Sequence, residues 1–131
     1  MNGLLMMQGP LLVRQSHVWS RPRIENGNIA SLQPPTLERL RDWMRARVKV
    51  RGQDEWLFIK LHAHGAQEKN DDVLLGQAMH QFHRALRDFS AQQGFQFYYA
   101  TAREMAQLVA QAEQGFSTPD FEQLSWRKLL K

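Results

Sequence analysis

The chain has 131 residues, a formal net charge of +4, 43% hydrophobic residues and no cysteine. This length suits one globular domain and is too short for a complete eight-unit (β/α) barrel, which needs about 200 residues or more. The absence of cysteine excludes a disulfide scaffold and a thiolate metal site, and no apolar run approaches the ~18 residues that span a bilayer.

The N-terminal third is predicted to contain one short apolar strand at residues 4–7, which extends to residues 11–13 beyond Gly9-Pro10. Residues 14–35 are predicted to be irregular, because prolines and an Asn-Gly-Asn run at residues 26–28 supply turn chemistry. Irregular segments of this length are usually functional or disordered, and this one contains His17 and Trp19. The first residues lack a basic n-region, so we expect no signal peptide and a cytoplasmic location by default.

Residues 36–48 are predicted to form an amphipathic helix capped by Thr36, with apolar residues at three- and four-residue spacing. The positive charge is concentrated here, since residues 36–51 hold six basic and two acidic side chains. Such a helix can bind phosphates, or it can be the solvated outer face of a packed helix. We favour the solvated face, because neither a helix-turn-helix signature nor interleaved aromatic residues accompany the charge.

The rest of the chain alternates between predicted strands and helices. Residues 56–62 are predicted to form a strand that is buried on both faces, which is typical of a parallel sheet covered by helices. A helix is predicted from Asp71 or Asp72 to Gly94, with a core stripe at Leu75, Met79, Phe82, Leu86 and Phe89.

Residues 95–99 are predicted to form an aromatic-rich strand, and a capping box at residues 101–104 is expected to begin a last helix that ends at Gly115. We therefore predict an α/β fold with about three parallel strands alternating with helices, a partial (β/α) barrel. It occupies residues 1–115, with a C-terminal tail at residues 116–131.

Candidate chemistry is concentrated at the end of the second predicted strand. Period-two alternation places Lys60, His62 and His64 on one face, where the two imidazoles can share a metal or one can act as a general acid or base. A structural histidine bonded to a loop carbonyl is the alternative. His80 and His83 are spaced as metal ligands on a helix, but we interpret them as helix-surface residues.

Five motifs in chain order resemble a known family: residues 9–11, 22–27, 35–36 with Arg39 and Trp43, 58–65 and 99–105. They are similar to the C-terminal half of bacterial polysaccharide deacetylases of the NodB-homology superfamily, a group of glycoside hydrolase/deacetylase barrels. The resemblance spans about residues 9 to 115. Its most specific parts are Lys60-Leu61-His62-Ala63-His64-Gly65 and Thr101-Ala102-Arg103-Glu104-Met105.

The resemblance implies a distorted (β/α) barrel that hydrolyses N-acetyl groups on a polysaccharide with the help of a divalent, zinc-like metal. It assigns His62 as the acid that protonates the leaving amine and Leu61 as a wall of the acetyl pocket. We add Lys60 and Glu25 as candidate substrate-binding residues and His64 as a candidate metal ligand. The early Asp-Asp and His-x-x-x-His motifs of the family are absent, so we expect this chain to hold no metal firmly by itself.

The leading hypothesis is thus a fragment or truncated homologue of a carbohydrate-active hydrolase that is inactive alone. It predicts folding with a missing half-barrel or by self-association. A second hypothesis is a small basic module that binds an anionic partner such as nucleic acid through residues 36–51. The leading hypothesis expects no nucleic-acid partner. A third is a small metal-dependent enzyme that uses His62 and His64.

Overall fold

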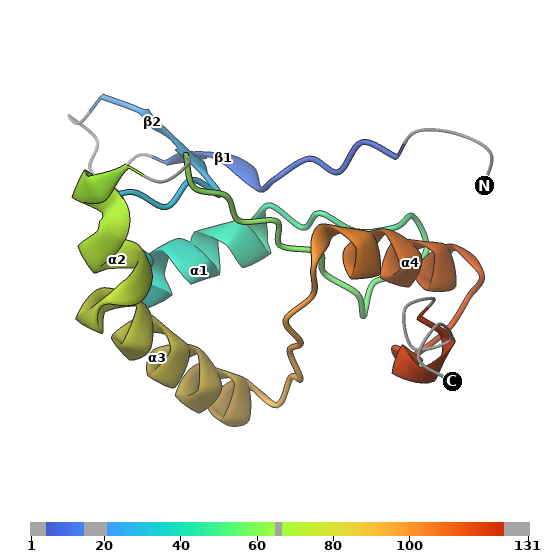
Figure 1. Ribbon diagram of the computed structural model, residues 1–131. Coiled ribbons are helices and arrows are strands. Elements are labelled where there is room, and N and C mark those ends of the chain that lie inside the picture. Colours follow the sequence, from blue (N-terminus) through green and yellow to red (C-terminus); the bar gives the residue numbers. More distant parts are fainter. Residues whose placement is uncertain (1–4, 15–20, 65–66, 125–131) are drawn as a thin grey trace.

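The computed structural model describes residues 5–14, 21–64 and 67–124. Its strands are β1 (Leu11–Arg14) and β2 (Arg23–Asn26), which pair antiparallel with Val13 opposite Ile24. Its α-helices are α1 (Leu37–Arg45), α2 (Asp71–Leu75), α3 (Gln77–Gln93) and α4 (Ala102–Glu113), and two short 3₁₀ helices are η1 (Glu68–Asn70) and η2 (Phe121–Gln123). In Figure 1, β1, β2 and α1 to α3 lie on one side of the molecule, and α4 and η2 lie on the other.

The helix boundaries follow from local chemistry. The Thr36 hydroxyl accepts a hydrogen bond from the Arg39 N–H, and this confirms the predicted cap of α1. The capping box of α4 is confirmed as well, because Thr101 and Glu104 exchange both of its hydrogen bonds. Gly94 ends α3 in the left-handed conformation, with φ of 71°, which glycine adopts without a steric cost.

The prediction of a single helix from Asp71 to Gly94 is wrong at one point. Gly76 separates α2 from α3, and a Cβ on this residue would lie only 2.3 Å from the Asp72 carbonyl oxygen. Leu75 consequently leaves the predicted core stripe and is 80% exposed. The other four members of the stripe pack into the core as predicted.

The predicted fold class is also wrong, because the chain does not form a partial (β/α) barrel with three parallel strands. Within residues 5–14, 21–64 and 67–124, the strands are the antiparallel β1 and β2, and the parallel pairing is a single bridge between Asn28 and His62. Residues 56–61 and 95–100 run through the molecule without a strand ladder. β2 lies where the sequence predicted only irregular structure.

The physical reason lies in two separate apolar clusters, both of which use residues 56–61. The first cluster, under α4, buries Trp56, Phe58, Leu108, Val109, Ala112 and Leu124. The second cluster, between α1 and α3, buries Leu40, Trp43, Phe82 and Leu86, with Ile59 and Leu61 packed against it. The extended segment therefore packs against a cluster on each face, although Leu57 is 37% exposed, and helices and loops rather than strands flank it.

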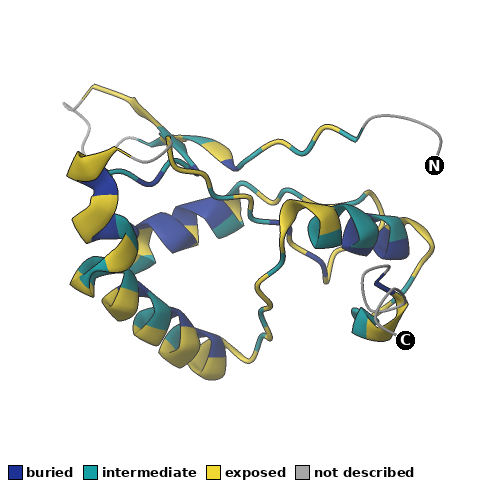
Figure 2. Ribbon diagram, in the orientation of Figure 1, coloured by how far each residue is buried: buried dark blue, intermediate teal, exposed yellow. Residues whose placement is uncertain are grey.

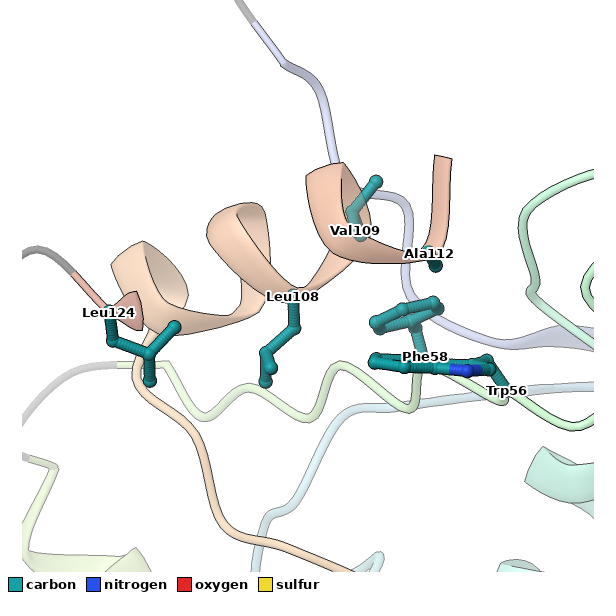
Figure 3. Close-up of a cluster of buried hydrophobic side chains, with 6 residues drawn as sticks. All are labelled: Trp56, Phe58, Leu108, Val109, Ala112 and Leu124. Carbon is teal, nitrogen blue, oxygen red and sulfur yellow. The ribbon is translucent and has the colours of Figure 1, made fainter. Parts of the chain in front are cut away.

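Figure 3 shows the rings of Trp56 and Phe58 lying one over the other beneath α4, with their centroids 5.9 Å apart. Leu124 enters the same cluster from beyond η2 and is only 1% exposed. Figure 2 shows that the buried residues of α1 and α4 occupy their inner sides, whereas exposed residues cover much of α2 and α3. Within the described residues, none of the helices combines the length and the hydrophobicity needed to cross a bilayer.

Candidate functional site

The chain segments that contain Pro10, Gly27 and Lys60 come into close contact at Gly27. A Cβ on this residue would lie 2.4 Å from the Lys60 carbonyl oxygen and 3.2 Å from the Cδ of Pro10, so only glycine fits without displacement. The close approach lets the His62 N–H donate to the Gly27 carbonyl at 2.9 Å, while the Ile29 N–H donates to the His62 carbonyl at 2.8 Å. The backbone of His62 is thus held on both sides.

The side chains of His62 and His64 are exposed next to this crossing. Their ring centroids are 5.8 Å apart and their planes are nearly perpendicular, at 88°. Imidazole can donate or accept a proton near neutral pH, so an exposed imidazole on a fixed backbone suits proton transfer to a ligand. The structure therefore brings together the two histidines that the sequence singled out.

Glu25 lies on the side of β2 that faces α1. Its Oε1 atom accepts hydrogen bonds from the Nε of Arg39 at 2.9 Å and from the indole Nε1 of Trp43 at 3.0 Å. The Arg39 and Glu25 side chains are only 9% and 13% exposed. Glu25 thus anchors β2 to α1, and its predicted role in substrate binding stays a prediction.

Lys60 and Leu61 point into different surroundings. The Lys60 ammonium group is exposed and donates to the Met7 carbonyl at 3.4 Å, whereas Leu61 packs against the second cluster. Their predicted contacts with a substrate stay predictions. His17 and Trp19 lie outside the described residues.

The donor set near His62 does not meet the needs of a hydrolytic metal ion. Such a site uses about three protein ligands and an open position for water. Within residues 5–14, 21–64 and 67–124, no group of three or more histidine or acidic side chains is placed to hold a metal. His62 and His64 supply two ligands at most, so we derive no chemical step through a metal.

The basic side chains of residues 36–51 are largely occupied by partners inside the chain. Arg45 pairs with Asp42 at 3.1 Å, Arg47 and Lys49 both pair with Asp54, and Arg39 is buried against Glu25. The guanidinium of Arg41 lies 5.1 Å from the ring centroid of Phe89. Arg47 and Lys49 lie beyond the end of α1 and share the single Asp54 carboxylate, so the predicted binding of an anionic partner by residues 36–51 stays a prediction.

One pair of polar residues was missed by sequence reasoning. His83 on α3 forms a hydrogen bond of 2.6 Å between its Nδ1 atom and the hydroxyl of Tyr99. Tyr99 is 66% exposed, and the partial burial of its side chain raises its pKa above the ordinary value of 10.0, while the nearby Arg87 charge lowers it by less. The only signal was the alternation of aromatic residues at 95, 97 and 99, which does not reveal a partner on α3.

A shallow depression of about 660 Å³ lies beside η2 and is lined by Phe116, Thr118, Pro119, Asp120, Phe121 and Glu122. It contains none of the residues that the sequence singled out, and its Asp120 carboxylate is occupied by hydrogen bonds from the Glu122 N–H at 3.0 Å and the Gln123 side chain at 2.7 Å. We therefore place the candidate site at His62 and His64. Comparison with protein-family models, with curated proteins and with solved structures gives no match in any of the three. The resemblance that rests on the motifs consequently stays a hypothesis.

Proposed function

We propose that the chain forms one wall of an active site that hydrolyses the N-acetyl amide of a polysaccharide, and that it is inactive alone. In this reaction water adds to the acetyl carbon, the C–N bond breaks, and the leaving nitrogen takes a proton from the His62 imidazolium. Acetate and a free amine are the products. A partner polypeptide supplies the groups that activate the water.

The observation that carries the proposal is that His62 has an exposed ring on a backbone that is hydrogen bonded on both sides. Its ring is exposed, while its N–H and C=O are both hydrogen bonded to the segment that contains Gly27 and Ile29. A proton donor must meet the leaving group at hydrogen-bond distance, so a fixed backbone beneath an exposed ring is the arrangement that this role needs. The motif at residues 60–65 supports the choice of an amide in an N-acetylated sugar.

The test is a nuclear magnetic resonance titration of the labelled chain with N-acetylated oligosaccharides of glucosamine and galactosamine. We expect the imidazole signals of His62 and His64 to shift with at least one N-acetylated oligomer and not with its de-N-acetylated counterpart. His62→Ala should abolish the response of His64, whereas His80→Ala, a change at an exposed residue of α3, should leave it intact.

Acetate release is measured in the same samples, and the chain alone should release none. If neither imidazole responds to any N-acetylated oligomer, or if both respond equally to the de-N-acetylated forms, the proposed substrate class is wrong. Acetate release by the chain alone would overturn the proposal that it is incomplete.

A further inference from the structure

Arg39 uses every hydrogen-bond donor of its guanidinium group. The Nε atom donates to Glu25, one terminal nitrogen donates to the Gln33 and Pro34 carbonyls, and the other donates to the Asn26 and Asn28 carbonyls. The five donor–acceptor distances run from 2.5 to 3.1 Å. Arg39 is 7% exposed and its guanidinium carbon lies 5.0 Å from the ring centroid of Trp43.

The acceptors lie at both ends of the loop that joins β2 to α1. The Asn26 and Asn28 carbonyls flank Gly27, and the Gln33 and Pro34 carbonyls precede the cap of α1. Trp43 adds a second donor to the Asn26 carbonyl at 2.9 Å. The conformation of residues 26–28 is therefore defined by a side chain of α1, with an internal Asx turn in which the Asn28 N–H donates to the Asn26 side chain.

This loop segment is the one that holds His62. The Gly27 carbonyl, between the two carbonyls bound by Arg39, accepts the His62 N–H, and the next residue after Asn28 donates to the His62 carbonyl. A continuous set of hydrogen bonds thus runs from the guanidinium of Arg39 through residues 26–29 to the backbone of His62. We propose that Arg39 is a positioning residue for His62, acting through the backbone around Gly27.

Lysine cannot reproduce this arrangement. Its ammonium group has three donors on one atom, whereas the planar guanidinium spreads five donors over three nitrogens in a fixed geometry. Arg39→Lys keeps the charge that balances Glu25 but leaves several partly buried carbonyls without their donor. The segment at residues 26–28 should then lose its fixed conformation, and His62 should lose its support.

The experiment measures hydrogen exchange of backbone amides in the full chain. In Arg39→Lys we expect the His62 and Ile29 amides to exchange about tenfold faster relative to the Val109 amide of α4. Leu108→Ala, which weakens the first cluster, should accelerate exchange of the Val109 amide more than exchange of the His62 and Ile29 amides. Arg45→Lys, which changes a 71% exposed side chain on the same helix, should leave both ratios unchanged.

A general structural role would accelerate His62, Ile29 and Val109 alike, and that result would overturn the proposal. If Arg39→Lys does not fold, Trp43→Phe provides the second test, because it keeps Arg39 and removes one of the two donors to the Asn26 carbonyl. It should accelerate the His62 and Ile29 amides about threefold relative to Val109, and unchanged ratios would refute the proposal.

The significance of this positioning for catalysis rests on the proposed function, but the exchange measurement does not involve a sugar. Failure of the oligosaccharide titration in the wild-type chain would remove the substrate and leave the link from Arg39 to His62 standing. Unchanged exchange ratios in the variants would remove the link and leave the substrate assignment standing. The two outcomes are therefore distinguishable.

Discussion

Gly27→Ala is the substitution that most directly tests the crossing of the three backbone segments. The added Cβ would lie 2.4 Å from the Lys60 carbonyl oxygen, which is 0.6 Å inside the 3.0 Å limit that such contacts observe. The colliding atom belongs to the backbone, so it cannot move away as the end of a flexible side chain would. Gly27 has no positive φ, and an alanine there carries no backbone strain that would confuse the result.

The size of the effect follows from two opposing contributions. Overpacking against a well-ordered backbone costs about 1–3 kcal/mol, while replacing glycine by alanine stabilises by about 0.4–1 kcal/mol through the unfolded state. We expect a net loss of about 1–2 kcal/mol in the free energy of unfolding. The displacement of Lys60 should also weaken the hydrogen bond from the His62 N–H to the Gly27 carbonyl.

Gly9→Ala is the matched control, because its Cβ would approach the same Lys60 oxygen at 3.2 Å. A shift of a few tenths of an ångström relieves that contact, so its net effect should be within about 0.5 kcal/mol of zero. Both variants are compared with the wild-type chain by urea denaturation and by the amide chemical shift of His62. A Gly27→Ala variant as stable as Gly9→Ala, with an unmoved His62 amide, would refute the reasoning.

Two further predictions concern the other parts of the molecule. Tyr98→Phe leaves Tyr99 as the only tyrosine, and its ultraviolet titration should have a midpoint above 10.0, rising further with Arg87→Ala; a midpoint at or below 10.0 contradicts the burial argument. Because the pKa is raised in the folded state, the associated stability is present below pH 10.0 and is lost as the pH rises through the folded-state pKa. Leu124→Ala should lower the free energy of unfolding by about 2–5 kcal/mol, whereas Leu75→Ala should change it by less than about 0.5 kcal/mol in the same denaturation assay. Equal effects would contradict the burial of Leu124 at 1% exposure against 80% for Leu75.

Features that depend on neighbouring residues were predictable from the sequence. The Thr36 cap, the capping box at Thr101 and the end of α3 at Gly94 were all predicted and are present. Each involves groups at most four residues apart along the chain, so the pattern of residue types is enough to identify it. The Asx turn at Asn26 belongs to the same class.

Features that depend on partners far along the chain were not predictable in the same way. The continuous run of apolar residues from Trp56 to Ile59 predicted burial on both faces, and the packing of Trp56 against one cluster and Leu61 against the other agrees with it. That pattern does not specify which backbone, if any, pairs with the segment, and the inference of a parallel sheet was wrong for this reason. The sequence pattern groups Arg39 with the basic surface side chains of residues 36–51, because its acceptors lie in β2 and the loop that follows rather than on its own helix.

Contacts between residues far apart in the chain also explain how the backbone of His62 is held in place without a β-sheet. The residues before it are held by two clusters at once, Trp56 and Phe58 under α4 and Ile59 and Leu61 between α1 and α3. His62 itself makes two backbone hydrogen bonds to the loop at residues 27–29. Arg39 donates hydrogen bonds to the Asn26 and Asn28 carbonyls of the same segment. Apolar packing therefore restrains the residues that precede His62, and directional hydrogen bonds determine the position of the His62 backbone. Because these restraints act on the backbone and leave the ring exposed, His62 combines a defined backbone position with access to a ligand, which neither a buried core histidine nor a histidine on an unrestrained loop provides.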